Sequence, residues 1–304
     1  MIFHIFAAYT RYMKVSGFTF VRNAVKYDYP VVEAIRSILP LCDEVVVSVG
    51  DSDDGTLRLI ESIGSPKLRI VHSVWDDSLK AGGRILAVET DKALDQVSPD
   101  STWAFYIQAD EVVHEDDYPA IRAAMEQYKD DLRVQGLLFN YRHFYGSYDY
   151  LGDSRTWYNK EIRIIRNDRR IRSYRDAQGF RLNNEKLLVK PVKAWMYHYG
   201  WVKNPAEQAK KNKNSASLYY GHDKEMMSRV LSAEEFDYSA IDSLKKFTGT
   251  HPALMQDRIA RKNWQFEYDI SRKNFSSFKR RLLYWIEQQT GVRLFDYKNY
   301  RVIR

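Results

Sequence analysis

A short stretch between residues 103 and 117, WAFYIQADEVVHEDD, places several carboxylates directly after a run of apolar and aromatic residues. Crowded carboxylates repel one another and resist ionisation unless water solvates them or a cation binds them. Mg²⁺ takes one or two protein carboxylates and completes its coordination with water and phosphate oxygens. Asp110, at the end of the apolar run, is therefore the first candidate for a cation ligand. The alternative is that Glu111, Glu115, Asp116 and Asp117 form a solvated loop and helix start, which the helix dipole favours.

The elements that must position these carboxylates alternate along the first half of the chain. Four β-rich apolar runs are typical of parallel strands covered on both faces, and helical spacing appears between them. The order predicts an α/β domain with a mostly parallel sheet. Asp54 stands at an N-cap position before GTLRLIESI. The expected strands are residues 14–21, 43–49, 67–74 and 103–108, and the expected buried helical stripes are Leu79, Leu86, Ala93 and Val97, and Ile121, Met125 and Tyr128.

Polar turns follow three of these expected strands. They are TFVRN after the first strand, GDSDDGT after the second and QADE after the fourth. In open α/β sheets, ligands bind outside the carboxyl ends of the strands. We therefore expect the three turns to meet at one edge of the sheet and to form a site there.

Four segments resemble the landmarks of the family 2 glycosyltransferases in their order of appearance. They are FTFVRNA, DEVVVSVGDSDDGT, WAFYIQADE and MYHYGWV, which lie between about residues 14 and 202, and the closing TGVRLFDYKNYRVI resembles the tails of bacterial members. The resemblance implies a GT-A-like, Rossmann-like catalytic domain over residues 13–204. It also implies an inverting enzyme that moves a sugar from a nucleotide-sugar to a glycan or glycolipid hydroxyl in surface polysaccharide or lipopolysaccharide synthesis.

The resemblance also implies a metal site. Members carry D-x-D after the fourth strand, and the last Asp binds Mg²⁺ or Mn²⁺ on the donor diphosphate. Here the triplet is Gln108, Ala109 and Asp110, which implies Asp110 as the metal ligand and Gln108 as a neutral hydrogen-bonding group at the donor. His198 in MYHYGWV matches a histidine near the metal and the diphosphate; the alternative is a hydrogen-bonded core histidine.

The resemblance also implies residues that bind the nucleotide, but only part of the family pattern is present. Arg22 and Asn23 match the family's RN turn, and Arg84 in LKAGGRILA matches an arginine that faces the nucleotide-sugar, although a solvated arginine is the alternative. The family's Asp after the second strand falls on Val49, which leaves Asp51 as a displaced candidate. The base therefore stays open between uracil, guanine and thymine.

Inverting transfer needs a base that takes the proton of the acceptor hydroxyl, and one Asp or Glu suffices. By position in the family, Asp176 in YRDAQGFR is the first candidate and Glu185 is the second. The structural alternative for Asp176 is an ion pair with Arg172 or Arg175.

Composition and the lack of certain motifs reduce the number of function classes that fit the sequence. The sequence contains none of the patterns G-x-S-x-G, G-x-G-x-x-G and G-x-x-x-x-G-K-[ST], so the serine hydrolase elbow, the dinucleotide fingerprint and the phosphate loop are not indicated. Cys42 is the single cysteine, which excludes an intrachain disulfide and fits a reducing cytoplasm. The net charge of +7 and runs such as NYRHFYGSYDYLG leave a non-catalytic nucleic-acid or polyanion binder as the alternative function.

The two ends of the chain have separate expectations. Residues 1–12 are expected to be an upstream extension without a signal peptide. Residues 205–304 are expected to form a helical C-terminal extension. In RKNFSSFKRRLLYWIEQQ, an apolar stripe of Phe275, Phe278, Leu282 and Trp285 faces away from Arg272, Lys273, Lys279, Arg280 and Arg281. This helix suits either an anionic membrane surface at the inner face of the plasma membrane or docking on the core.

Overall fold

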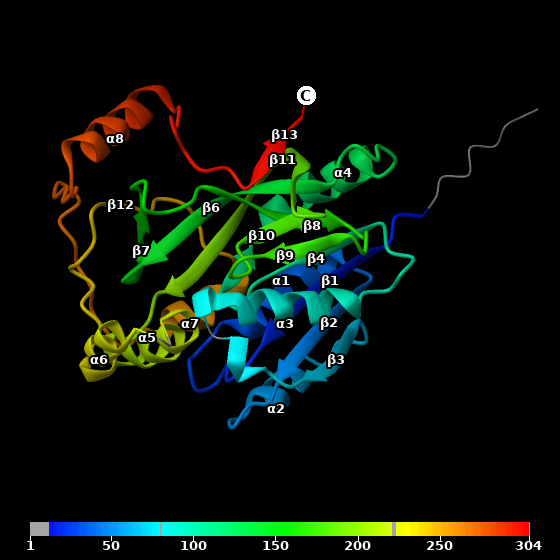
Figure 1. Ribbon diagram of the computed structural model, residues 1–304, viewed down its shortest axis with the longest axis horizontal. Helices are drawn as coiled ribbons and strands as arrows, with labels where there is room; N and C mark the ends of the chain where they lie inside the picture. Colours follow the sequence, from blue (N-terminus) through cyan, green and yellow to red (C-terminus); the bar gives the residue numbers. More distant parts are fainter. Residues whose placement is uncertain (1–11, 80, 221–222, 304) are drawn as a thin grey trace, which may run out of the picture.

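The computed structural model describes residues 12–79, 81–220 and 223–303 (Figure 1). Eleven of the twelve residues expected to form an upstream extension lie outside these ranges. The strands are β1 (Val15–Val21), β2 (Glu44–Gly50), β3 (Leu68–Ser73), β4 (Trp103–Tyr106), β5 (Glu111–Val113), β6 (Gly136–Tyr145), β7 (Ser147–Gly152), β8 (Lys160–Arg166), β9 (Ile171–Tyr174), β10 (Gly179–Leu182), β11 (Glu185–Trp201), β12 (Leu244–Lys246) and β13 (Tyr300–Val302). The α-helices are α1 (Val31–Ile38), α2 (Thr56–Glu61), α3 (Arg84–Asp95), α4 (Tyr118–Tyr128), α5 (Pro205–Tyr219), α6 (Lys224–Ser232), α7 (Gln256–Ala260) and α8 (Phe278–Thr290).

The strands form one sheet in the order β3-β2-β1-β4-β8-β6-β11-β10-β9. Strands β3, β2, β1 and β4 are parallel, and they coincide with the four strands expected from the sequence. Beyond β4 the sheet becomes mixed, because β8 is antiparallel to both β4 and β6, while β6 and β11 are parallel. The expected α/β class is therefore confirmed, and its parallel part is the half nearest the N-terminus.

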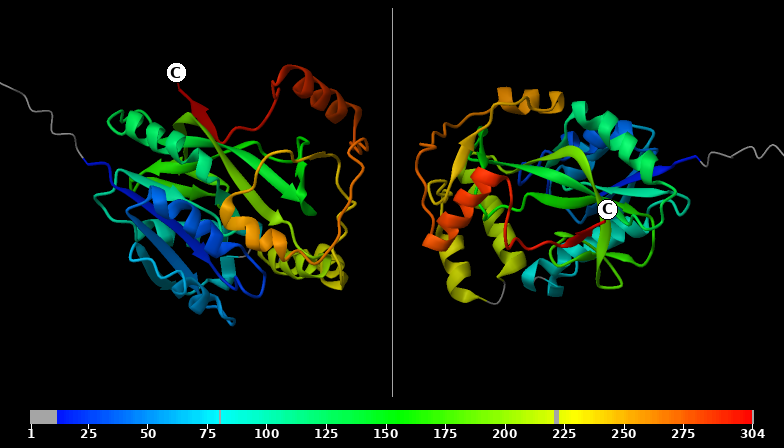
Figure 2. Two further views of the ribbon diagram at one scale, coloured as in Figure 1. Left: turned by 180° about the vertical axis from the view of Figure 1, so that it is seen from behind. Right: turned by 90° about the horizontal axis from the view of Figure 1, so that it is seen from above.

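Helices cover both faces of this sheet (Figures 1 and 2). On one face, apolar side chains of α1, α2 and α4 join one core cluster, which includes the expected Ile121 and Met125. On the other face, α3 contributes Ala93 and Leu94 to a second cluster with the rings of Phe18, Tyr106 and Phe180. With both faces buried, the polar turns at the strand ends are left as the exposed edge of the sheet.

Residues after 204 begin with the helices α5 and α6 and end on the sheet. Two short strands from this part join it, because β12 pairs with β7 and β13 pairs with β11. Helix α8 lies at the periphery in Figures 1 and 2 and contacts the β7–β8 loop, since Tyr284 donates to Oδ2 of Asp153 at 2.7 Å and Glu287 pairs with Arg155 at 2.9 Å. Among the described residues, no helix is long and apolar enough to span a bilayer. The proposed boundary at residue 205 stays a prediction.

Candidate active site

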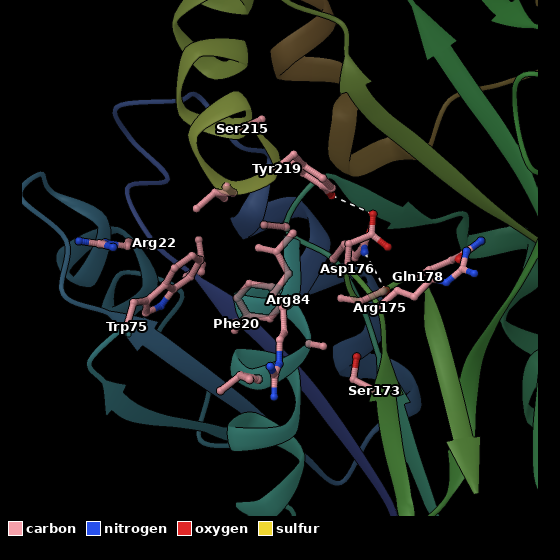
Figure 3. A pocket seen from close by; sticks show the side chains of 18 of the residues that line it. Phe20, Arg22, Trp75, Arg84, Ser173, Arg175, Asp176, Gln178, Ser215 and Tyr219 are labelled. Atoms are coloured by element: carbon pink, nitrogen blue, oxygen red, sulfur yellow. Dashed lines mark hydrogen bonds between the residues drawn. The ribbon is translucent and has the colours of Figure 1, made fainter. Parts of the chain in front are cut away.

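A pocket of about 1320 Å³ opens at the carboxyl ends of β1 and β4 (Figure 3). Its walls come from the start of α3, the loop between β9 and β10, and the face of α5 that turns toward the sheet. Figure 3 shows Arg22 and Trp75 at one side of the pocket and Asp176 with Tyr219 at the other. Of the residues implied by the family resemblance, those that line the pocket are Arg22, Asn23, Arg84, Gln108, Asp110 and Asp176.

Asp110 follows β4 and is held by a lysine from a distant helix. The ammonium of Lys211 on α5 lies 3.0 Å from Oδ2 of Asp110 and also donates to the carbonyl of Gly200 at 2.8 Å. Burial opposes ionisation of Asp110, but the surrounding charges, that of Lys211 first, together with the hydrogen bond from Lys211 outweigh it and hold the pKa of the carboxyl well below its usual range. Asp110 is therefore a carboxylate at neutral pH.

His198 lies behind Asp110 and not in the pocket lining. Its Nε2 is 3.7 Å from Oδ1 of Asp110, and its Nδ1 is 3.2 Å from Nδ1 of His143. Burial lowers the pKa of His198 below its usual value, and burial reinforced by His198 lowers that of His143 well below. Both imidazoles are therefore neutral at pH 7, and His198 can act as a nitrogen ligand.

These atoms decide how well a divalent cation fits. Among the described residues there is no group of three or more His, Cys, Asp or Glu side chains that could hold a metal ion. The pair of Asp110 Oδ1 and His198 Nε2 nevertheless matches the one or two protein ligands that suffice when substrate phosphates and water complete the shell. The residues present thus fit a cation shared with a bound diphosphate, and the expected Mg²⁺ or Mn²⁺ stays a prediction.

Glu111 is buried, whereas the alternative for the acidic stretch expected it in a solvated loop. Its side chain is fully buried and accepts hydrogen bonds from Nε and Nη2 of Arg163 at 2.9 and 2.8 Å and from the hydroxyl of Tyr141 at 2.6 Å. Asp117 also has a structural role, since it accepts a hydrogen bond from the backbone N–H of Trp195 at 2.8 Å. The carboxylates after β4 therefore divide: Asp110 faces the pocket, and Glu111 locks the loop beneath it.

The side of the pocket that contains Arg22 and Trp75 has an aromatic wall. The guanidinium carbon of Arg22 lies 5.4 Å from the centre of the Trp75 ring, and the rings of Trp75 and Phe20 are 5.8 Å apart. Asp51 does not line the pocket; its Oδ2 is 3.3 Å from Nη2 of Arg22, so it acts on the pocket through that arginine. Trp75 was not singled out in the sequence, where a tryptophan just after an expected strand carries no distinctive signal.

Asn23, Arg84 and Gln108 reach the pocket in different ways. Asn23 has φ of 54°, and its Oδ1 accepts a hydrogen bond from the backbone N–H of Asp53 at 3.0 Å, so it also joins the turns after β1 and β2. Arg84 is exposed at the first position of α3. Gln108 donates through Nε2 to the carbonyl of Ala177 at 3.4 Å, which connects the loop after β4 to the loop that carries Asp176.

Asp176 projects into the pocket from a tight loop. Its neighbours Arg175 and Ala177 both have left-handed backbone conformations, with φ of 57° and 62°. Such conformations cost free energy in residues other than glycine and persist where the surroundings enforce them. The hydroxyl of Tyr219, at the end of α5, donates to Oδ2 of Asp176 at 2.9 Å (Figure 3).

The alternative ion pair of Asp176 is not present among the described residues. Arg172 instead donates to Asp95 at 2.7 Å. Arg175 lies over the rings of Tyr174 and Tyr297, at 5.2 and 5.4 Å from their centres. Asp176 is therefore held by a neutral hydroxyl and not by a guanidinium.

Glu185 lies outside the pocket. It is the first residue of β11, its side chain is 77% exposed, and its nearest charged partner is Arg301 at 3.8 Å. The β10–β11 turn, which contains Asn183 and Asn184, directs Glu185 to the surface. The structure thus does not bring Glu185 together with Asp176 in the pocket, and its role as the second candidate base stays a prediction.

Three further residues belong to the site and were missed in the sequence: Lys211, Tyr219 and His143. Each contacts a residue far away along the chain, so no local spacing marks it. The sequence offers a clue to two of them, because Lys211 and Tyr219 both lie on α5, the helix that follows the MYHYGWV segment.

Comparison with known proteins finds shallow structural likenesses. No protein-family model and no curated protein matches the chain. The structure of S. aureus TarS is 16% identical over 72% of this chain and 42% of TarS, with a TM-score of 0.39, so the chain spans less than half of that protein. A TarS 1-349 structure in complex with UDP-GlcNAc is 15% identical over 72% of each chain, with a TM-score of 0.39. Glucosyl-3-phosphoglycerate synthase from Mycobacterium tuberculosis, in complex with Mn²⁺, UDP and phosphoglyceric acid, is 19% identical over 44% of this chain and 43% of that chain, with a TM-score of 0.29. Overlaps of this depth carry no functional argument.

Proposed function

We propose that this chain is an inverting glycosyltransferase that moves a sugar from a nucleotide-sugar to the hydroxyl of a glycan or lipid-linked acceptor. The observation that carries the proposal is that one pocket brings together Asp110, which follows a buried parallel strand, and Asp176, which a strained loop presents. The first suits the donor diphosphate, and the second suits the acceptor proton. The aromatic wall of Trp75 and Phe20 suits a base or ribose at the opposite side.

The chain's own residues divide the work of a single displacement. The hydroxyl of Tyr219 donates a hydrogen bond to Oδ2 of Asp176, which leaves Oδ1 free to accept a proton. Oδ1 takes the proton of the acceptor hydroxyl while the oxygen of that hydroxyl forms a bond to the sugar carbon C1. The bond from C1 to the diphosphate oxygen breaks with its electron pair on the diphosphate. Arg22 and Lys211 are two of the positive side chains that line the pocket and can stabilise that charge. A divalent cation held by Asp110 and His198 would supply further positive charge to the leaving diphosphate.

Helix α8 supports a proposal for two further partners, an anionic membrane surface and a lipid-linked acceptor. Its apolar stripe does not dock on the body: Phe278 is 79% exposed and Trp285 is 59% exposed, with Leu282 between them at 43%. Lys279, Arg280 and Arg281 lie in the first turns of the same helix. A basic helix with an exposed apolar face fits an anionic membrane surface, and a lipid-linked acceptor would be held at such a surface.

The proposal is tested by ligand binding and turnover in three variants. Saturating nucleoside diphosphate, at 100 times its dissociation constant, stabilises the folded state by about 2.7 kcal/mol. We expect such a shift with UDP, GDP or dTDP, strengthened by Mn²⁺, and loss of the Mn²⁺-dependent part in Asp110→Asn. Release of nucleoside diphosphate from nucleotide-sugars should fall by about 10² to 10⁴ in Asp176→Asn while donor binding persists.

Glu185→Gln is the matched control, because it makes the same chemical change at an exposed carboxylate. It should bind donor and turn over like the parent. The proposal fails if Asp176→Asn turns over within a few-fold of the parent, or if no nucleotide-sugar and no nucleoside diphosphate stabilises the protein.

A further inference from the structure

Behind Asp110, the carbonyl of Tyr158, the ring of His143 and the ring of His198 form a line that runs from the protein interior to the pocket. Nε2 of His143 lies 2.7 Å from the carbonyl oxygen of Tyr158. Nδ1 of His143 lies 3.2 Å from Nδ1 of His198, and Nε2 of His198 lies 3.7 Å from Oδ1 of Asp110. The run NYRHFYGSYDYLG, which the proposed function leaves unused, supplies His143 to this line.

The hydrogen bonds in this line assign the ring protons. A carbonyl oxygen only accepts, so Nε2 of His143 must carry a hydrogen. A neutral imidazole carries one N–H, so Nδ1 of His143 is the acceptor and Nδ1 of His198 must be the donor. The remaining nitrogen, Nε2 of His198, is then without a hydrogen and presents its lone pair toward Asp110.

Packing fixes His143 in the orientation that this assignment needs. The residue is 3% exposed. Its ring stacks on those of Tyr141 and Trp157 at 5.2 and 5.1 Å, and it meets the ring of Tyr158 edge-on at 4.5 Å. Rotation of the imidazole would break the bond to the Tyr158 carbonyl and leave a buried polar group without a partner, which is costly.

The outcome is a pair of electron-donor atoms that face each other. Nε2 of His198 and Oδ1 of Asp110 lie at 3.7 Å with no hydrogen assigned between them. Lys211 occupies the other carboxylate oxygen, so it does not separate this pair. Two such atoms repel each other unless a cation lies between them, and two ligands of one hard cation lie about 3 to 4 Å apart when each bond is about 2.1 Å.

We propose that His143 is a positioning residue for cation binding: it holds His198 in the tautomer whose Nε2 is free to act as a ligand beside Asp110. Metal-bound histidines usually donate their second ring N–H to a neighbouring acceptor, which fixes the ring and its tautomer. Here the acceptor is itself a histidine, oriented in turn by a backbone carbonyl. The inference rests on the cation site within the proposed function, and not on sugar transfer.

The experiment measures tautomer and cation binding in three proteins. The ring ¹⁵N shifts of His198 without metal report which nitrogen carries the hydrogen, and titration with Mn²⁺ alone, followed by electron paramagnetic resonance, reports affinity. His143→Phe keeps the stacked ring but removes the acceptor; we expect the His198 hydrogen to leave Nδ1 and Mn²⁺ affinity to fall by about 10- to 100-fold. His143→Asn offers an amide oxygen near the position of Nδ1, and should restore the tautomer and most of the affinity.

Thermal unfolding of each variant shows that it is folded. The inference is overturned if His198 in the parent carries its hydrogen on Nε2, if folded His143→Phe binds Mn²⁺ like the parent, or if both variants lose affinity equally, which would assign His143 to packing. A parent that does not bind Mn²⁺ overturns it as well. A parent that binds Mn²⁺ in a His143-dependent way but transfers no sugar refutes the proposed function alone.

Discussion

The ammonium of Lys211 lies 3.0 Å from Oδ2 of Asp110, although 101 residues separate the two along the chain. Both side chains are largely buried, at 11% and 14% exposure, so each charge depends on the other. Lys211 also lines the pocket. A positive charge therefore already stands beside the carboxylate that is expected to meet the donor diphosphate.

This contact predicts what loss of the lysine does to donor binding. Lys211→Met keeps the length of the side chain and removes its charge. Charged hydrogen bonds contribute about 1.5 to 3 kcal/mol, so the affinity for nucleoside diphosphate measured with EDTA should fall by roughly 10-fold or more. Calorimetric titration with UDP, GDP and dTDP makes the measurement.

Lys210→Met is the control, because Lys210 directly precedes Lys211 on α5, is 61% exposed and pairs with Glu207 at 2.6 Å. It should bind like the parent. Equal metal-free affinities for Lys211→Met and the parent would show that this ammonium does not meet the diphosphate.

A second prediction concerns the glycine that packs against the proposed base. A Cβ on Gly83 would come within 2.8 Å of both the Cβ of Asp176 and a ring carbon of Tyr219. Gly83→Ala should therefore displace the hydrogen-bonded pair and lower turnover by about tenfold or more, since small misplacements of catalytic groups are costly. Turnover and donor affinity are measured together, and affinity should change less.

Gly82 provides a control at the next position. Its φ of 63° is close to the 71° of Gly83, but a Cβ there would meet nothing within 4 Å. Gly82→Ala thus carries the same backbone strain without the collision. If the two variants lose turnover to the same extent, strain in the loop explains the effect and the collision does not.

The parts of this molecule that the sequence predicts are those encoded in local pattern. Apolar runs predicted the four parallel strands, and the rule that ligands bind at their carboxyl ends predicted the edge where Asp110 and Arg22 lie. The family resemblance then added Asp176, which no local pattern marks.

The parts that the sequence could not predict are contacts between distant segments. Glu111 reads as a solvated carboxylate until Arg163, 52 residues later, is found against it. Tyr219 and His143 likewise join the site across 43 and 55 residues. The spacing of apolar residues also does not predict whether a helix buries its apolar stripe, because the stripe of α4 is buried, whereas that of α8 is exposed.

A third prediction follows from a buried glutamate next to the site. Burial raises the pKa of Glu161 to about 8, and its Oε2 has no hydrogen-bond partner among the described residues. In the unfolded chain an ordinary Glu has a pKa of about 4.3. Between these two values the unfolded state releases the proton and the native state keeps it, so the free energy of unfolding falls as pH rises, by about 1.4 kcal/mol per pH unit from this group.

Glu161→Gln removes that proton exchange. Chemical denaturation at pH 5 and pH 8 should show the variant gaining stability relative to the parent as pH rises, with little further change above pH 8. Glu61→Gln, at an exposed glutamate in α2, should show no such trend. A pH-independent difference between Glu161→Gln and the parent would mean that Glu161 is ionised in the native state.

The last prediction concerns the surface of α8. With Phe278 and Trp285 exposed beside Arg280 and Arg281, the protein should float with vesicles that contain phosphatidylserine at low salt. Binding should fade near 0.5 M salt, where the Debye length is about 4 Å. Arg280→Glu with Arg281→Glu should abolish flotation, whereas Arg36→Glu with Arg58→Glu makes the same change in net charge on α1 and α2 and should leave it intact. Equal losses in the two double variants would assign binding to net charge rather than to α8, and no flotation of the parent at any salt concentration would leave the exposed stripe for a protein partner.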